Sequence, residues 1–199
     1  MDAANQLELN KGDNFMIGVD VSASMQTRDC PGNMTRIDYL KEKVKYFARE
    51  ASKWDDDGID VLTFGQKVTP YKGVTADKAE SIIGGLQANE ATTHTHLLIQ
   101  EAYKLHKAGN YDQTVLFVAT DGAPSDKEEV KKAIRAIALE LREEHEFAIS
   151  FLTVGQIDSN LRSFLTELDD TLGAKYDIVD VKTLEEVDFE SAFAGALND

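Results

Sequence analysis

Short apolar runs alternate with longer amphipathic segments along nearly the whole of this 199-residue chain. A run such as 114–119 is almost entirely apolar, which is typical of a strand buried on both faces of a parallel sheet. A segment such as 36–54 instead repeats its apolar residues every three or four positions, as an amphipathic helix does. Strands that alternate with helices in this way predict one sheet that is covered by helices on both faces.

The pattern predicts a Rossmann-like, doubly wound α/β fold with a mainly parallel sheet of six strands. The expected strands are 15–20, 59–64, 67–71, 114–119, 147–154 and 176–181. The expected helices are 36–54, 76–86, 95–107, a segment capped by Ser125 or Asp126, 159–168 and 183–197. Pro70 places the third strand at an edge, where we expect it to run antiparallel. We expect one domain over residues 14–198, preceded by a polar tail at 1–13.

Oxygen-bearing side chains follow two of the expected strands at the point where each strand ends. Asp20, Ser22 and Ser24 come directly after the first strand, and Asp121 comes directly after the fourth. In such sheets, ligands bind beyond the carboxyl ends of the strands, where the strand order reverses. If these two strands are neighbours, both carboxylates lie in one crevice, and the loop 92–95 supplies further hydroxyls to the same edge. Carboxylate and hydroxyl oxygens are ligands that a hard cation such as Mg²⁺ prefers.

These segments together resemble the metal-ion-dependent adhesion site of von Willebrand factor type A domains. The resemblance rests on order, spacing and strand context in three motifs: Asp20-x-Ser22-x-Ser24, Thr92-Thr93-His94-Thr95 and Thr120-Asp121-Gly122. It covers nearly the whole chain and implies a stand-alone domain of the bacterial, intracellular type. The metal ligands that it implies are Asp20, Ser22, Ser24, Thr93 and Asp121.

The resemblance also implies what the site does. Ser22 and Ser24 would bind the metal directly, Thr93 would do so in the ligand-bound state, and the two aspartates would bind directly or through water. Because the hydroxyls add no charge, the metal stays electrophilic toward a further carboxylate. We therefore expect a non-enzymatic, metal-dependent protein-binding module that docks a partner's Asp or Glu onto Mg²⁺, with Mn²⁺ or Ca²⁺ as substitutes. Family analogy suggests an AAA-type ATPase or a stress-response assembly as the partner.

Several residues around these motifs carry further expectations. Ala23 stands where the family most often has Gly, and the longer segment 25–33 is expected to rim the site. Thr95 is expected to cap the helix that follows it. His94 and His96 have a spacing that suggests zinc, but no Cys or further His lies at ligand spacing. We therefore expect both histidines to be solvated or helix-capping.

The net charge of −15 restricts the partners of the chain. It argues against nucleic acid and against anionic membrane surfaces, because both attract clusters of Lys and Arg. Cys30 is the only cysteine, so no internal disulfide can form, which suits a reducing compartment. The first residues do not resemble a signal peptide, and no apolar run approaches the length of a membrane span. We expect a cytoplasmic protein, and the sequence leaves its oligomeric state open.

Two other functions stay open on the sequence alone. A metal-dependent phosphatase or hydrolase would use Asp20 as its nucleophile, but such sites need a second Asp two residues on, where this chain has Ser22. The chain also has neither a nucleophile elbow nor a Gly-rich phosphate loop. The second alternative is a metal-free scaffold domain.

In some members of the family the last helix moves when the metal site rearranges, but we expect the segment 183–197 to be fixed.

Overall fold

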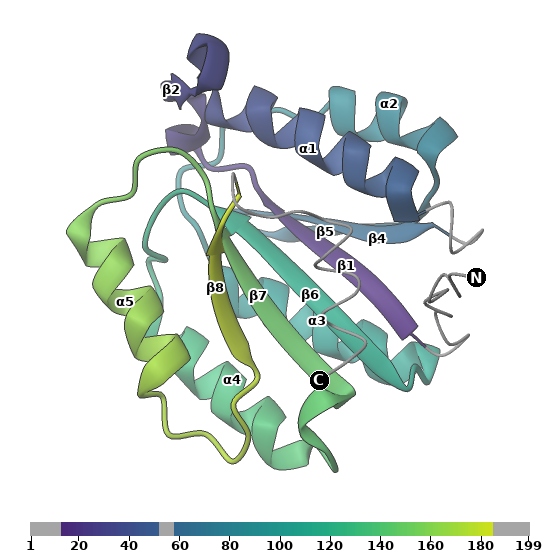
Figure 1. Ribbon diagram of the computed structural model, residues 1–199, viewed down its shortest axis with the longest axis vertical. Helices are drawn as coiled ribbons and strands as arrows, with labels where there is room; N and C mark the ends of the chain where they lie inside the picture. The colour runs from purple at the N-terminus through teal and green to yellow at the C-terminus, as the bar shows by residue number, and fades with distance from the viewer. Residues whose placement is uncertain (1–12, 52–57, 185–199) are drawn as a thin grey trace, which may run out of the picture.

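A six-stranded sheet organises the part of the chain that the computed structural model describes, residues 13–51 and 58–184 (Figure 1). Its strand order is β5-β4-β1-β6-β7-β8, in which β5 is antiparallel to β4 and every other pair is parallel. The bounds are β1 (Asp13–Asp20), β4 (Ile59–Phe64), β5 (Val68–Val74), β6 (Gln113–Thr120), β7 (Phe147–Thr153) and β8 (Val179–Thr183). The prediction of a mainly parallel, doubly wound sheet with one antiparallel edge strand is confirmed.

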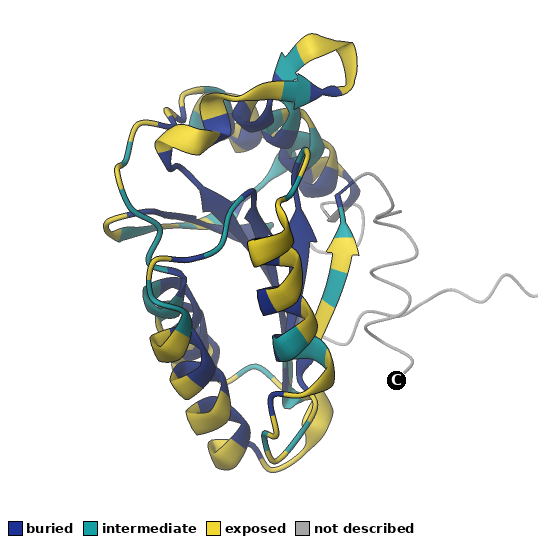
Figure 2. Ribbon diagram, turned by 90° about the vertical axis from the view of Figure 1, so that its left-hand side faces the viewer, coloured by how far each residue is buried: buried dark blue, intermediate teal, exposed yellow. Residues whose placement is uncertain are grey.

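The burial of each strand follows its apolar pattern. Every residue of β4 is buried, as is every residue of β6 after Gln113, because helices cover both faces of these central strands. The edge strand β5 instead has half-buried and exposed residues and carries Pro70, which lacks the N–H that a central strand would need. Figure 2 shows the same division, with buried strands inside and exposed residues along the outer sides of the helices.

Five helices cover the two faces of the sheet in the described residues: α1 (Arg36–Ala51), α2 (Ala76–Gly84), α3 (Thr95–Gly109), α4 (Lys127–Glu140) and α5 (Ser159–Asp170). Alternate residues of β1 separate the two cores: Ile17 packs with the side chains of α1 and α2, whereas Met16 packs with those of α3, α4 and α5. Each large apolar side chain that is fully buried contributes roughly 1.5–3 kcal/mol, so the two cores together hold the layers in place.

Gly18 allows α3 to pack closely against the middle of β1. A Cβ atom at Gly18 would stand 2.4 Å from the Cδ2 atom of Leu98, which is fully buried on α3. No other residue type lets the helix come this close to the strand. The start of α3 is therefore held at a defined position relative to the end of β1.

The strand order reverses beside β1. From β1 the chain passes to β4 and β5 on one side, and then crosses to β6 on the other side of β1. In the parallel pairing of β1 with β6, Val19 lies opposite Ala119, so Asp20 and Thr120 leave the sheet next to each other. The expected neighbours are confirmed, and their shared carboxyl edge is the place where sheets with such a reversal bind ligands.

The structure corrects the prediction at the last described strand. β8 begins at Val179 rather than at 176, and Thr183, which the pattern predicts to open the final helix, is instead the last residue of β8 and pairs with Thr153. The reason is the register with β7, because the backbone N–H of Leu184 still donates to the carbonyl of Thr153 at 3.0 Å. Three predicted parts lie outside the described residues: positions 185–197 of that helix, residues 52–57 with Trp54, and the tail apart from Asp13.

Candidate metal centre

Asp20 is completely buried at the carboxyl end of β1. Its Oδ1 atom accepts a hydrogen bond from the backbone N–H of Ser22 at 2.8 Å, and its Oδ2 atom accepts one from the hydroxyl of Thr120 at 2.7 Å. Burial raises the pKa of Asp20 to about 6; hydrogen bonds from Ser22 and Thr120 oppose the rise, and the negative charge of Asp121 adds to it. A cation bound here would stabilise the charged form of this buried carboxylate, which is disfavoured by burial and by the second carboxylate.

A chain of hydrogen bonds joins the end of β1 to the end of β6. Ser22 precedes the short 3-10 turn η1 (Ala23–Gln26), which carries Ser24. The two hydroxyl oxygens lie 3.0 Å apart, and Ser24 Oγ donates to Asp121 Oδ1 at 2.8 Å. The fold thus brings four of the five predicted ligands, which lie on two segments far apart in sequence, into one group.

The oxygen atoms of this group have the spacing of ligands around one small ion. Mg²⁺ holds its six ligands at about 2.0–2.1 Å in octahedral geometry, so adjacent ligand oxygens stand roughly 2.9 Å apart. The separations from Ser22 to Ser24 and from Ser24 to Asp121 are 3.0 and 2.8 Å. All candidate ligand atoms on the side chains of this group are carboxylate or hydroxyl oxygens. The residues present therefore fit a hard dication.

Thr93, the fifth predicted ligand, lies on the loop that runs beside this group. Backbone hydrogen bonds hold the loop: the N–H of Ala23 donates to the carbonyl of Glu90 at 2.8 Å, and the N–H of Ser125 donates to the carbonyl of Thr93 at 3.2 Å. The Thr93 side chain is half-buried, and among the described residues the neighbouring Thr92 Oγ1 is buried without a hydrogen-bond partner. The structure therefore places Thr93 on a loop that is tied to the η1 turn through Glu90 and to the segment before α4 through its own carbonyl, outside the hydrogen-bonded group of the other four predicted ligands.

Arg36 is the residue of this site that sequence reasoning missed. Its Nη1 atom donates to Asp121 Oδ2 at 2.8 Å, while its Nε and Nη2 atoms bind both carboxylate oxygens of Asp29 at 2.9 and 2.6 Å. The guanidinium holds the pKa of Asp29 below its usual range, and the two carboxylates raise the pKa of Arg36. A sequence signal did exist, because a cation at the start of a helix opposes the helix dipole. Arg36, the first residue of α1, therefore needs another reason to be there.

The segment expected to rim the site folds into a small hairpin. The hairpin consists of β2 (Arg28–Cys30), the turn η2 (Pro31–Asn33) and β3 (Met34–Thr35), the last of which lies just beyond the expected segment 25–33; Cys30 is buried. Asp29 connects this hairpin to the site through Arg36. One expectation here is wrong: the N-cap position of α3 is His94 rather than Thr95, which is the first helical residue and is 1% exposed.

The expectation that the histidines are solvated or helix-capping is met for His94 in its position. His94 occupies the N-cap position without a capping hydrogen bond from its side chain, and both rings are half-buried. Asp126, just before α4, joins them: its Oδ2 atom contacts His96 Nδ1, and one ligand atom from each of the three residues lies within 4.8 Å of the others. This group could not be predicted from the sequence, because Asp126 lies on another segment, 30 positions after His96.

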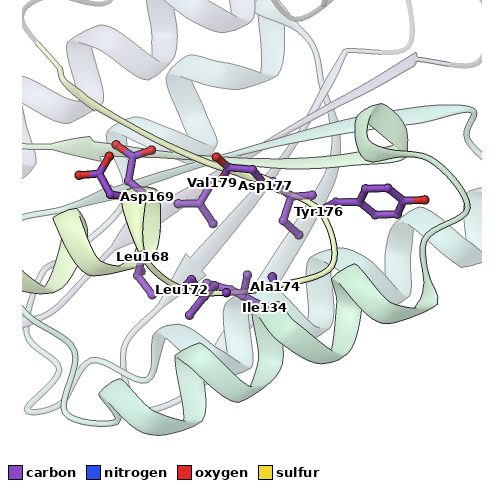
Figure 3. Close-up of a pocket in the computed structure, with 11 residues that line it drawn as sticks. Ile134, Leu168, Asp169, Leu172, Ala174, Tyr176, Asp177 and Val179 are labelled. Carbon is purple, nitrogen blue, oxygen red and sulfur yellow. The ribbon is translucent and has the colours of Figure 1, made fainter.

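A cavity of about 160 Å³ lies at a different place, between the end of α5 and the start of β8 (Figure 3). Apolar side chains such as Ile134 lie along its lower side in this view, whereas Asp169 and Asp177 lie along its upper side. The cavity begins where β8 begins, so it lies at the amino end of that strand and contains none of the predicted metal ligands. It is therefore not part of the metal centre.

Solved structures share this fold at low sequence identity. The chain aligns with a mutant of the PilB minor pilin from Streptococcus sanguinis at a TM-score of 0.66 and 10% identity, over 98% of this chain and 62% of that one. It aligns with the manganese-loaded TRAP protein of Plasmodium vivax at a TM-score of 0.60 and 14% identity, over 94% and 71% of the two chains. A von Willebrand factor type A structure from Catenulispora acidiphila gives 0.58 and 15%, over 94% and 41%.

The chain spans less than two thirds of the length of the pilin, and identities this low indicate a shared fold only.

Among the described helices, none has the length and apolar character needed to cross a membrane.

The sequence supplies the evidence for the family. No curated protein matches the chain. The family model for the von Willebrand factor type A domain, however, matches residues 15–124, which is more than half of the chain and includes all five predicted ligands. The chain therefore belongs to the von Willebrand factor type A domain family.

Proposed function

We propose that this domain, over residues 14–198, binds a protein partner through Mg²⁺ held by Asp20, Ser22, Ser24, Thr93 and Asp121. The observation that carries the proposal is the hydrogen-bonded chain from Asp20 through the backbone N–H of Ser22 to the hydroxyls of Ser22 and Ser24 and to Asp121, at the point where the strand order reverses. The oxygen atoms of Ser22, Ser24 and Asp121 in it are 3.0 and 2.8 Å apart. When bound, the metal supplies an open coordination position for the carboxylate of a partner's Asp or Glu. Membership of a family of interaction modules supports binding rather than catalysis.

The residues behind the ligands support this function by fixing them in place. Thr120 and the backbone of Ser22 hold the two oxygens of Asp20 in defined positions. Arg36 binds one oxygen of Asp121 and leaves the other directed to Ser24. Because the guanidinium also compensates part of the charge of Asp121, the site is poorer in negative charge than two free carboxylates. A dication held there keeps its attraction for a further carboxylate.

The charge of the chain indicates the kind of partner. At a net charge of −15, an acidic partner would be repelled, so the docking Asp or Glu should stand in neutral or basic surroundings. An AAA-type ATPase or a stress-response assembly is the partner class that family analogy favours. The single cysteine suits a reducing compartment, and we place the function in the cytoplasm for that reason.

Calorimetric titration with Mg²⁺ and Mn²⁺ tests the metal site. Wild type should bind one ion, and Asp20→Asn should weaken binding by more than the roughly 10- to 100-fold that is typical for loss of a residue behind the ligands. Ser24→Ala should also weaken it, because the substitution removes one of the predicted ligand oxygens. Since Ser24 is exposed, the change leaves the core undisturbed. Ser81→Ala is the matched control, since the Ser81 hydroxyl lies on α2 and donates to the carbonyl of Lys78 at 3.0 Å.

The binding function needs its own readout. A partner that docks through the metal should be retained by wild type in Mg²⁺ and lost both in EDTA and with Asp20→Asn. Equal retention under all three conditions would favour the metal-free scaffold. Failure of wild type to bind either ion, with or without the partner, would refute the proposed metal site.

A further inference from the structure

A second group of metal-ligating side chains lies at the same edge of the sheet. His94 and His96 flank the first residue of α3, and Asp126 occupies the N-cap position of α4. One ligand atom from each residue lies within 4.8 Å of the other two, and all three side chains are half-buried. None of these residues belongs to the oxygen-only group around Asp20.

Several polar atoms of this group have no partner. Among the described residues, His94 Nδ1 and Asp126 Oδ1 are buried without a hydrogen bond, and Thr92 Oγ1 nearby is in the same condition. A buried polar atom left without a partner costs about 1–3 kcal/mol, so such atoms are rare unless something else satisfies them. The cluster therefore holds unused ligand capacity.

Hydrogen bonds from backbone N–H groups bring the loop before α3 and the segment before α4 together, without any contribution from the histidine rings. The N–H of Ser125 donates to the carbonyl of Thr93 at 3.2 Å, which ties the segment before α4 to the loop before α3. The N–H of His96 lies 3.3 Å from Asp126 Oδ2, which accepts its hydrogen bond. The three side chains thus converge because of how the loops pair.

We propose that His94, His96 and Asp126 form a separate binding site for Zn²⁺. Two imidazoles and one carboxylate are a common ligand set of zinc sites with three protein ligands, and they leave a fourth position open for water or another ligand. Imidazole nitrogens suit Zn²⁺, whereas Mg²⁺ prefers oxygen, so the two groups at this edge select different metals. The zinc proposal stands independently of the proposed docking function.

A simpler interpretation is that His96 and Asp126 form an ordinary ion pair between α3 and α4. That pair accounts for His96 Nδ1 and Asp126 Oδ2, which contact each other. It leaves His94 Nδ1 and Asp126 Oδ1 without partners, and it does not explain why the His94 ring stands 6.0 Å from the His96 ring at the same place. One ion bound by all three residues explains both.

The experiment is a Zn²⁺ titration of the full chain without an affinity tag, carried out in saturating Mg²⁺. Calorimetry gives the stoichiometry, and Co²⁺ used as a probe gives the visible absorption of a tetrahedral site. Wild type should bind one Zn²⁺ tightly, and His94→Ala, His96→Ala and Asp126→Asn should each lose that site. His145→Ala is the matched control because His145 is exposed and remote in sequence, and Asp20→Asn should keep zinc while it loses Mg²⁺.

Several outcomes would overturn the proposal. These are absence of tight Zn²⁺ binding in wild type, full retention of the site in the three variants, and loss of zinc in Asp20→Asn with retention in His96→Ala, which would place zinc at the Mg²⁺ group. Far-UV circular dichroism and thermal unfolding in EDTA check that each variant is folded. His94→Ala remains informative even if Asp126→Asn unfolds, because the His94 side chain makes no capping hydrogen bond.

Discussion

The two ends of α3 both carry histidine, but the structure treats them in opposite ways. At the amino end, His94 and His96 are half-buried, and His94 Nδ1 has no hydrogen-bond partner among the described residues. At the carboxyl end, His106 is 3% exposed, its Nδ1 atom exchanges a 2.8 Å hydrogen bond with Thr114 Oγ1, and its ring stacks 5.8 Å from that of Tyr103. A histidine whose polar atom is satisfied inside a core serves stability, whereas one whose polar atom is left unused is available for a ligand.

Replacing His106 should have the largest effect on stability. His106→Ala removes a buried ring from beside Tyr103 and Phe147 and leaves the Thr114 hydroxyl without this partner. We expect the free energy of unfolding to fall by about 2–4 kcal/mol, measured by urea unfolding in EDTA.

The matched substitution at the other end of the helix is His96→Ala. It should cost less than about 1 kcal/mol in EDTA, because a partly exposed pair contributes little. If His96→Ala were as costly as His106→Ala, the two ends would not differ in the way described.

Substituting Gly18 should have the next largest effect, because it disturbs the contact that seats α3. A Cβ atom 2.4 Å from Leu98 Cδ2 forces the helix or the side chain to shift, so Gly18→Ala should cost about 1–3 kcal/mol. Gly122→Ala, just after β6, is the control, since a Cβ atom there meets nothing within 4 Å. Urea unfolding of both variants in EDTA gives the comparison.

A double mutant locates the cause of the Gly18 effect. In a Leu98→Ala background, Gly18→Ala should cost clearly less than it does in wild type, because the colliding atoms are gone. Additive costs would mean that strain elsewhere, and not the seat of α3, is responsible.

The smallest expected effect is the pH dependence that His106 contributes. Burial lowers the pKa of His106 from 6.5, and the charge of Lys107 lowers it further, while Glu146 opposes the change. The unfolded chain therefore binds the proton more readily, so this contribution to stability is full above pH 6.5 and is lost as the pH falls through the folded-state pKa.

This contribution is best measured as a difference between proteins. Asp20, whose pKa is raised to about 6, acts with the opposite sign, because its contribution is lost as the pH rises through that value. Urea unfolding from pH 7.5 to 5 in EDTA should therefore show a shallower loss of stability in His106→Gln than in wild type, and an unchanged loss in the exposed control His145→Gln. Parallel curves for wild type and His106→Gln would contradict the assignment.

The local pattern of the sequence predicted most of the fold. β4 has the predicted bounds of Ile59–Phe64, and α2 and α3 begin at the predicted residues 76 and 95. The pattern failed at β8, where Thr183 continues the strand instead of opening a helix. Its pairing with Thr153 on β7 decides this, and a pairing partner 30 positions earlier leaves no local signal.

The candidate site divides in the same way. The motif from Asp20 to Ser24 and the one at Asp121 could be read from the sequence, because both follow strands that show a clear apolar run. Their hydrogen-bonded union remained conditional on β1 and β6 being neighbours, which the structure supplies. Ligation of a metal by these residues stays a prediction until it is measured.

The sequence by itself determined the alternation of strands and helices, the buried central strands and the family, because apolar periodicity and motif spacing are local properties of the chain. Only the tertiary structure decided which polar groups meet. Arg36, on α1, reaches Asp121 across 85 positions, and His96, on α3, meets Asp126 across 30. The second contact depends on how α3 packs on β1 and on the hydrogen bond between the loops before α3 and α4. Such contacts depend on where each element packs, and no residue pattern within a single segment encodes that position.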